Sequence, residues 1–281
     1  MRNGIVPAAI CTGHADAPGA RHLRRISARD RNLLLLGTPN LHDAHVVRLL
    51  RAAKPDAILS WFWPFKIPHE VLALAPRGAF GVHPSLLPRW RGRDPYFWAI
   101  REGDVETGVT LHRLDAEYDT GAIIEQQSLS IRDTDTAWTL AKRLDRPSLR
   151  LLVSCAQRLQ KGEALAGAPQ PLNGICEAPR PSDEDIVISF HDNTDSILRL
   201  IRAAAPEPGA SAQIDDEFVS VLEAKRSEAT IPRALQPSEA FVDNDGNVHV
   251  VTNDGALTLV RVRTEDDRVL TRRDIQKLLA K

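Results

Sequence analysis

The sequence predicts an α/β protein with a Rossmann-like, mostly parallel sheet and a smaller C-terminal β-rich (OB-like) domain. In the first half, short apolar runs alternate with stretches of helical periodicity, which is typical of a parallel sheet covered by helices on both faces. In the second half, alternating stretches flank Asp-Gly pairs at 245–246 and 254–255, which are strong hairpin signals. Residues 163–184, rich in Ala, Gly and Pro, predict an extended linker.

The elements of the first half follow from apolar runs bounded by turn residues and from helical spacing. Val46, Val47, Leu49 and Leu50, for example, recur as the apolar residues of one helix. A Pro-Gly turn at 18–19 precedes a helix rich in arginine. The predicted strands span 5–11, 33–36, 57–62, 78–82, 109–114 and 122–130, and the predicted helices span 20–29, 43–53, 68–75, 95–102 and 136–161.

The second half is expected to form a small antiparallel barrel or sandwich after a single helix. That helix is predicted at 193–205 and the strands at 217–224, 239–243, 247–252 and 256–262. The predicted domains are a catalytic domain at 1–162, the linker at 163–184 and the β-rich domain at 185–281.

Composition and charge exclude several classes of protein. Apolar residues at 43% and charged residues at 26% indicate a soluble globular protein. The net charge of −1 divides into about +6 for residues 1–180 and about −7 for 181–281, and an acidic surface is a poor partner for a phosphate backbone. No apolar run reaches the length of a membrane span, no signal peptide is visible, and the three cysteines lack metal-type spacing. We therefore expect a cytoplasmic protein without a membrane partner or a metal, and we find no signal for an oligomeric state.

The residues most suited to chemistry are His83 and Asp119. His83 ends an apolar run and opens a His-Pro-Ser-Leu-Leu-Pro turn, and Asp119 opens an Asp-Thr-Gly turn. A histidine titrates near neutrality, and a carboxylate beside it sets its tautomer and raises its basicity. Each residue alone also fits a structural role, as a core histidine or an Asx-turn. Together they predict a His–Asp pair in the cleft beyond the carboxyl ends of the strands.

These residues and their neighbours resemble the folate-dependent formyltransferase family, which includes methionyl-tRNA formyltransferase and the amino-sugar N-formyltransferases. The family pattern is Asn-x-His-Pro-Ser-Leu-Leu-Pro, then Thr-Gly-Val-Thr, then Asp-x-Gly. The matching segments here are 81–88, 107–110 and 119–121. Because the linker and the β-rich half also resemble the C-terminal domain of the methionyl-tRNA enzyme, the resemblance covers nearly the whole chain.

The resemblance implies transfer of a formyl group from 10-formyltetrahydrofolate, as cosubstrate, to a primary amine. In the roles that it implies, His83 stabilises the oxyanion or relays the proton, and Asp119 orients His83 and helps to move the proton from the amine to the leaving folate nitrogen. It also implies a folate pocket lined by residues 61–66 and by the backbone of 114–118. The candidate folate-binding residues are Trp63, Phe65, Leu114, Asp115, Glu117 and Tyr118. Trp63 and Phe65 suit stacking on a flat pterin, and they suit core packing equally well.

Two departures from the family pattern bear on activity. Gly81 stands where the family has an asparagine, whose carboxamide donates to the formyl oxygen, and loss of one such donor costs about 2.7–4 kcal/mol of transition-state stabilisation. We therefore expect weak or absent activity unless another group substitutes. The family also opens with a strand and a helix ahead of the segment that here begins at Met1, so this sequence is expected to lack them.

The sequence is consistent with two classes of acceptor amine. The acidic second half favours a small acceptor such as an amino sugar, and so does His112, which resembles the small-acceptor branch of the family. The two-domain layout and the basic helix at 20–29 favour methionyl-tRNA, which is the less favoured alternative. A third interpretation is a folate-binding relative with impaired or lost transfer, which Gly81 motivates, and a formyltetrahydrofolate hydrolase, in which water accepts the formyl group, ranks last.

Overall fold

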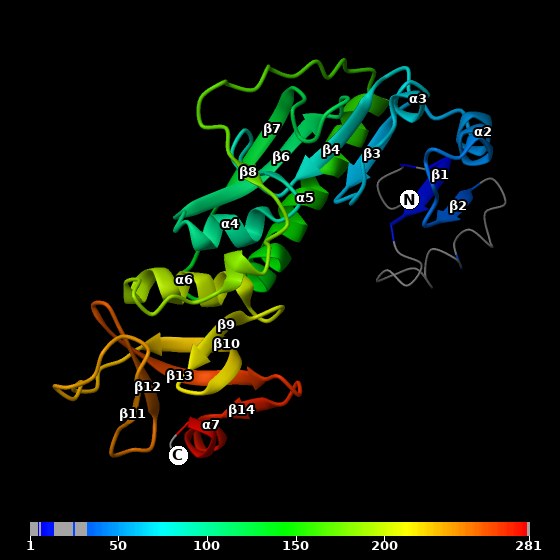
Figure 1. The fold of residues 1–281 in the computed structure, drawn as a ribbon. Helices are drawn as coiled ribbons and strands as arrows, with labels where there is room; N and C mark the ends of the chain where they lie inside the picture. The colour runs from blue at the N-terminus through cyan, green and yellow to red at the C-terminus, as the bar shows by residue number, and fades with distance from the viewer. Residues whose placement is uncertain (1–4, 6, 14–24, 26–32, 280–281) are drawn as a thin grey trace. The chain divides into compact units, whose positions relative to one another are not determined.

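The computed structural model describes residues 5, 7–13, 25 and 33–279, and its chain forms two compact units (Figure 1). Each unit is assembled from segments that are distant in sequence. The first consists of Met1–Arg93, Gly108–Ser128 and Leu144–Glu177, and the second of Asp94–Thr107, Leu129–Arg143 and Ala178–Lys281. The division into 1–162, 163–184 and 185–281 stays a prediction.

The strands of the first unit give the parallel, Rossmann-like part of the fold that the sequence predicts. Strands β1 (Ala9–Thr12) and β2 (Leu34–Gly37) pair in parallel. A second sheet has the order β3-β4-β6-β7, in which β3 (Ile58–Trp61) and β4 (Ala79–His83) are parallel. Strand β6 (Glu106–Arg113) joins β4 antiparallel, and β7 (Ile123–Ser130) lies beside β6. The sheet is therefore mixed at β6.

Helices bury the apolar faces of these strands. Helix α2 (Ala44–Ala52) begins after Asp43, whose carboxylate accepts from the His45 N–H. It packs with β1, β2, β3 and the short α3 (His69–Leu72) around one apolar cluster. The part of α5 (Ala137–Gln160) in this unit runs along the four-stranded sheet (Figure 1). Its buried residues recur every three or four positions, at Leu144, Ser148, Leu151, Cys155 and Leu159.

Cross-strand register places a row of polar side chains on one face of the sheet. In the pairing of β4 with β6, Gly81 lies opposite His112 and His83 lies opposite Thr110. Successive side chains of a strand point to opposite faces, and directly paired residues point to the same face. The intervening residues Phe80, Val82, Val109 and Leu111 are buried apolar side chains of the other face. The candidate site therefore lies on the face opposite this apolar layer.

The second unit contains the antiparallel C-terminal β domain, with strand order β11-β12-β13-β10-β9 and β14 paired to β13. Helix α6 (Thr194–Ala204) packs on β10 and against α4 (Pro95–Arg101), and α7 (Arg272–Leu279) packs on β12, β13 and β14. The strands are β9 (Ala210–Ile214), β10 (Glu217–Arg226), β11 (Ala240–Val242), β12 (Val248–Thr252), β13 (Gly255–Thr264) and β14 (Val269–Thr271).

Several expected boundaries differ from the observed ones. The first strand begins at Ala9 rather than at residue 5, and the basic helix at 20–29 lies, apart from Arg25, outside the described residues. Strands β9 and β14 and helix α7 were not predicted. The β12–β13 hairpin turns at Asn253 and Asp254, and Gly255 already belongs to β13, because it pairs with Thr252. Short strands β5 (Arg91–Gly92) and β8 (Glu177–Ala178) and the 3-10 turn η1 (Glu184–Ile186) complete the elements of the described chain. Among those residues no helix is long and apolar enough to span a membrane.

Candidate active site

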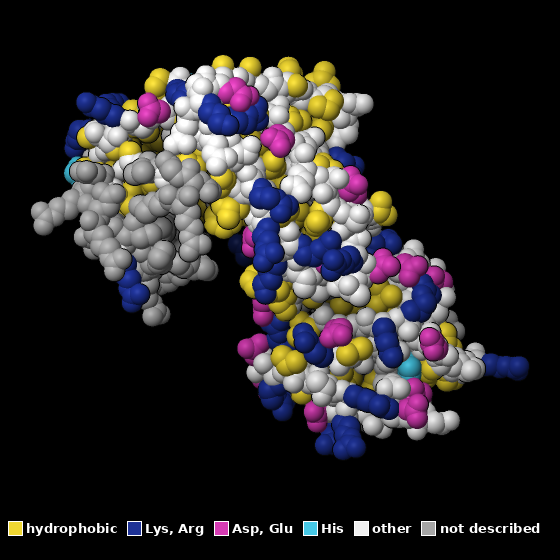
Figure 2. All heavy atoms as spheres, turned by 180° about the vertical axis from the view of Figure 1, so that it is seen from behind, with side chains coloured by type: hydrophobic (Ala, Val, Ile, Leu, Met, Phe, Trp, Pro, Cys, Tyr) yellow, Lys and Arg dark blue, Asp and Glu magenta, His cyan; other side chains and the backbone are white. Residues whose placement is uncertain are grey.

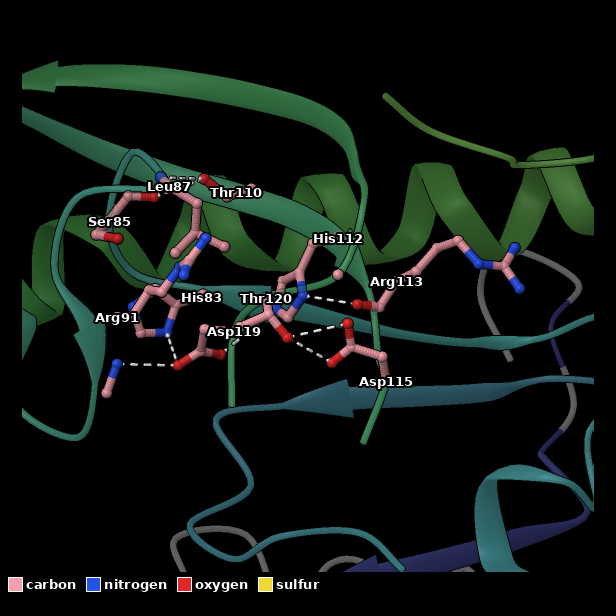
Figure 3. A network of polar contacts seen from close by, with 12 residues as sticks. His83, Ser85, Leu87, Arg91, Thr110, His112, Arg113, Asp115, Asp119 and Thr120 are labelled. Atoms are coloured by element: carbon pink, nitrogen blue, oxygen red, sulfur yellow. Dashed lines mark hydrogen bonds and ion pairs between the residues drawn. The ribbon is translucent and has the colours of Figure 1, made fainter. Parts of the chain in front are cut away.

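His83 and Asp119, predicted as a pair, lie beside each other in the first unit (Figure 3). His83 is the last residue of β4, and Asp119 lies in the loop that joins β6 to β7. His83 Nδ1 is 3.4 Å from Asp119 Oδ2, and the histidine is only 5% exposed. The two turns that the sequence indicates therefore meet at one point.

The turn at Asp119 is held in a conformation that few residues adopt. Asp119 has a φ of +55°, in the left-handed region that aspartate tolerates better than most residues. At Gly121 a Cβ would lie 1.9 Å from the carbonyl oxygen of Arg113, so only glycine lets the turn pass this close to the end of β6. The Gly92 N–H donates to Asp119 Oδ2 at 3.0 Å and fixes the carboxylate.

The hydrogen bond of the far ring nitrogen sets the tautomer of His83. Its Nε2 lies 2.7 Å from the Trp90 carbonyl oxygen, and because a carbonyl only accepts, Nε2 carries a hydrogen. In the neutral ring, Nδ1 then presents a lone pair toward Asp119. Nδ1 and Asp119 Oδ2 are therefore placed to exchange a proton.

His112, which in the sequence bears only on the choice of acceptor, is a second histidine beside the same carboxylate (Figure 3). Its Nε2 is 3.6 Å from Asp119 Oδ1, and its Nδ1–H donates to the Arg113 carbonyl at 2.8 Å. Burial lowers the pKa of His112, the Asp119 charge works against this effect, and His83 adds to it. In each ring, the nitrogen that does not donate to a backbone carbonyl therefore faces Asp119. A proton can be held between Asp119 and either of the two histidines.

The sequence signal that could have identified His112 is the strand alternation itself. His112 lies two residues after Thr110 on β6, and Thr110 is opposite His83. Once that register is known, His112 must lie on the face of His83 and Gly81. The register is a property of the folded sheet, so the residue pattern alone did not reveal it.

The His-Pro-Ser-Leu-Leu-Pro turn is braced by β6 and β7. Thr110 Oγ1 donates to the Ser85 carbonyl at 2.7 Å and accepts from the Leu87 N–H at 3.0 Å. Gln126 Nε2 donates to both Thr110 Oγ1 and the Leu87 carbonyl, at 2.8 and 3.0 Å. The Ser85 hydroxyl donates to the Arg89 carbonyl at 2.6 Å. These bonds make the turn a rigid support for His83.

Gly81 is buried, and the space beside it is already filled. A Cβ built at this position would lie 2.7 Å from Leu114 Cδ2 and 3.5 Å from His112 Nε2. A larger residue therefore requires the Leu114 side chain to move. A side chain at position 81 would also extend toward His112.

Of the six candidate folate-binding residues, Leu114 and Asp115 line a cavity of about 700 Å³. Arg113 and Ala79 also line it, together with parts of the segments 69–78 and 162–166. This volume lies within the range of about 300–1,000 Å³ that is typical of small-molecule sites. Trp63, Phe65, Glu117 and Tyr118 are not part of its lining.

Trp63 and Phe65 differ in burial. Trp63 packs against the apolar cluster of β1, β2 and α2, and among the described residues its buried indole N–H has no hydrogen-bond partner. Phe65 is 56% exposed and meets the Trp63 ring edge-on, with centroids 5.9 Å apart. The Trp63 ring thus packs against the apolar cluster, whereas Phe65 presents its ring to solvent.

Glu117 and Tyr118 lie in an exposed loop that contacts the segment after β3. Lys66 Nζ is 3.3 Å from Glu117 Oε2 and 6.0 Å from the centre of the Tyr118 ring. Tyr118 is 52% exposed. These contacts connect the two segments that the family resemblance implies for the folate pocket. In the described part of the chain, no group of histidine, cysteine and carboxylate side chains could hold a metal ion.

Two family profiles match the sequence. The one described as formyl transferase matches residues 10–155, and the one described as formyl transferase, C-terminal domain, matches 181–278. A methionyl-tRNA formyltransferase of Burkholderia multivorans is 33% identical over 231 residues, which cover 82% of this chain and 70% of that protein. One of Burkholderia vietnamiensis is 36% identical over 178 residues, which cover 63% of this chain and 54% of that protein.

Solved structures that share this fold include the following two. HypX from Aquifex aeolicus in complex with tetrahydrofolic acid aligns with a TM-score of 0.70 at 22% identity, over 97% of this chain. This chain spans 47% of HypX, about half its length. The N-formyltransferase from Helicobacter canadensis in complex with folinic acid and dTDP-3-aminofucose has a TM-score of 0.64 at 19% identity, over 90% of this chain and 99% of that chain. At these identities the likeness concerns the fold.

Proposed function

This chain belongs to the formyl transferase family, and from that premise we propose that it transfers a formyl group from 10-formyltetrahydrofolate to the primary amine of a small acceptor. The observation that carries the proposal is the contact of His83 with Asp119 at 3.4 Å, at the end of a buried strand. Gly81, at the position of the family asparagine, belongs to the same proposed catalytic group.

The proposed chemistry is the movement of one proton. The acceptor amine loses a proton as its nitrogen bonds to the formyl carbon, and the folate nitrogen gains one as its bond to that carbon breaks. His83 takes up the proton of the amine on Nδ1, which faces Asp119, the carboxylate stabilises the imidazolium, and the same proton then passes to the folate nitrogen. Asp119 in turn keeps its position through the Gly92 N–H. Nε2–H of His83 remains on the Trp90 carbonyl throughout, so the ring does not turn.

The proposed folate site combines the cavity beside Leu114 and Asp115 with the exposed Phe65 and Tyr118 rings. 10-Formyltetrahydrofolate would supply the formyl group there. The unpaired indole N–H of Trp63 is a buried donor that fits a polar heterocycle, since an unmatched buried donor is costly. Glu117 and its partner Lys66 would border the entrance of this site.

The test is formyl transfer by the wild-type chain and by His83→Ala with a panel of primary amines, including amino-sugar nucleotides. Loss of a general base or acid typically reduces rates by about 10²–10⁴-fold, so we expect His83→Ala to lose nearly all transfer. The control is His42→Ala, an exposed histidine outside this site. Transfer that is unchanged in His83→Ala would refute the site assignment.

Methionyl-tRNA is a second candidate acceptor because the similar curated proteins are methionyl-tRNA formyltransferases. The same assay with methionyl-tRNA as acceptor separates the two classes. Gly81 supports a third candidate, a folate-binding relative with impaired transfer. That protein would bind the folate and release no formylated product with any acceptor.

A further inference from the structure

Gln170 lies in the segment predicted as an extended linker, yet its side chain is anchored in the first unit. It is half-buried, whereas Pro169 and Pro171 are exposed. Its amide nitrogen donates to the carbonyl oxygens of Asp119 at 2.6 Å and Gly121 at 2.9 Å. Its amide oxygen accepts from Nε and from a terminal nitrogen of Arg91, at 3.2 and 2.7 Å. One side chain thus bridges two loops.

These two loops are the ones that hold the His83–Asp119 pair. Arg91 lies between Trp90, whose carbonyl accepts from His83, and Gly92, whose N–H donates to the Asp119 carboxylate. Through its amide oxygen, Gln170 therefore holds the Arg91 side chain. Through its amide nitrogen, it holds the backbone carbonyl of Asp119. It touches neither reacting side chain through its own amide group.

Backbone conformation explains why such a brace is needed. Trp90 and Asp119 both have positive φ angles, +58° and +55°, which non-glycine residues rarely adopt. Residues in sparsely populated regions persist only where surrounding contacts determine them. The Gln170 amide contacts the Asp119 backbone directly and, on the other loop, the Arg91 guanidinium. The Trp90 and Arg91 backbone N–H groups donate to Cys176, so Gln170 joins a loop that is held there to the strained turn at Asp119.

We propose that Gln170 is a positioning residue for the His83–Asp119 pair and that the linker is part of the active site. The proposal rests on the formyl transfer proposed above. Gln170 aligns the pair by holding the turn at 119–121 against residues 90–92, so that Asp119 faces His83 and keeps its bond from Gly92.

The variants Gln170→Ala and Gln170→Glu separate the two sides of the bridge. Alanine removes all four hydrogen bonds. Glutamate keeps an acceptor for Arg91 but has no N–H, so its oxygens would face the Asp119 and Gly121 carbonyls, which only accept. The matched control is Asn173→Ala, which truncates an exposed amide three residues further along the same segment.

Small displacements of a catalytic group cost on the order of 10²-fold in rate. We expect kcat to fall by about 10- to 100-fold in both Gln170 variants, with KM for the amine within about twofold and an unchanged melting temperature. We also expect faster hydrogen exchange at the Gly92 amide, because its acceptor is no longer held. Asn173→Ala should match the wild type in all four measurements.

Exchange at Gly92 does not depend on turnover, so it separates this proposal from the proposed function. If the wild type transfers no formyl group but Gly92 loses protection in both Gln170 variants, the positioning of the pair stands and the reaction assignment fails. If Gly92 stays protected, or if an active protein keeps its kcat in both variants, the positioning role is refuted. A loss of kcat that only follows a loss of melting temperature refutes it as well.

Discussion

At the scale of single residues, Asp119 is the carboxylate that both histidines of the candidate site face. Its two carboxylate oxygens face His83 Nδ1 and His112 Nε2 at 3.4 and 3.6 Å. The far nitrogen of each ring donates to a backbone carbonyl, of Trp90 for His83 and of Arg113 for His112. Neither ring can therefore change its tautomer without losing a hydrogen bond. A proton in this group is confined to the atoms around Asp119, which suits a reaction that removes a proton from one nitrogen and returns it to another.

Replacing His112 with glutamine tests how much stability the folded protein loses when this buried ring is protonated. Burial lowers the pKa of His112 from its ordinary value near 6.5, more than the Asp119 charge raises it. The folded protein thus resists a proton that the unfolded chain binds. The stability contributed by neutral His112 is present above about pH 6.5 and is lost as the pH falls through the folded pKa. We expect the melting temperature to fall more steeply between about pH 7.5 and pH 5 in the wild type than in His112→Gln.

The groups that act on His112 are Asp119, His83, Asp115 and the Arg113 backbone, and the first three carry ionisable side chains. Comparison with His42→Gln controls for a general effect of removing a histidine, because His42 is exposed on the surface. Melting curves of His112→Gln and wild type that stay parallel over this pH range would contradict the prediction.

Gly81→Asn tests whether this glycine limits activity. A carboxamide at this position would supply a donor of the kind whose loss typically costs about 10²–10³ in kcat. Its Cβ would lie 2.7 Å from Leu114 Cδ2, so the Leu114 side chain must shift to admit the asparagine. We expect a modest gain in kcat for Gly81→Asn and a larger gain for Gly81→Asn with Leu114→Ala, measured as formyl transfer at saturating amine.

Leu114→Ala alone is the control, because Leu114 also lines the proposed folate cavity and its loss is expected to raise KM for the folate. If the wild-type protein is already fully active and neither asparagine variant gains kcat, then Gly81 does not limit formyl transfer.

At the scale of elements, the sequence predicted those strands and turns that local residue pattern determines. The strand that ends at His83 and the Gly-containing turn at Asp119 are visible as an apolar run and a turn signal. Gln170 was not identified, since a glutamine between two prolines carries no periodicity and its contacts are with residues 49 to 79 positions away. His112 was not placed in the site because its position depends on register. Local sequence pattern predicts helices, strands and turns, whereas contacts between loops that are distant in sequence form only in the folded chain.

The turn between β11 and β12 is stabilised by a carboxylate. Asp243 accepts from the side chain and the backbone N–H of Asn247, from the Asp245 N–H and from His249 Nε2. The hydrogen bonds from Asn247 hold the pKa of Asp243 well below its ordinary range, and His249 adds to this effect. The stability that ionised Asp243 contributes is present above about pH 4 and is lost as the pH falls through the lowered pKa.

Asp243→Asn is therefore expected to lower the melting temperature at pH 7 and to flatten its decline between about pH 5 and pH 2.5. Thermal unfolding followed by circular dichroism measures both. Asp245→Asn, an exposed carboxylate in the same turn, serves as the control and should leave the pH dependence as in the wild type. If Asp243→Asn and Asp245→Asn behave alike, the hydrogen bonds of Asp243 contribute nothing specific to this turn.

At the scale of the whole molecule, charge bears on the acceptor. Residues 181–281 carry a net charge of about −7. On the face drawn in Figure 2, basic and acidic side chains lie interspersed over the C-terminal β domain and form no single basic patch there. A protein that neutralises several phosphates with Lys and Arg binds a nucleic acid with strong salt dependence. The charge of this domain favours a small acceptor, whereas the similar curated proteins favour tRNA.

Binding of initiator tRNA at a series of salt concentrations decides between these two arguments. If tRNA is not the acceptor, few phosphates are neutralised, and the slope of log K against log salt should be shallower than about −2. A small amine acceptor should show a KM that barely changes over the same range, because its charge is small and its contacts are local. A slope of about −5 or steeper, together with formylation of methionyl-tRNA, would contradict the small-acceptor proposal. It would then assign the phosphate contacts to basic residues outside the acidic C-terminal segment, since that segment as a whole repels the backbone.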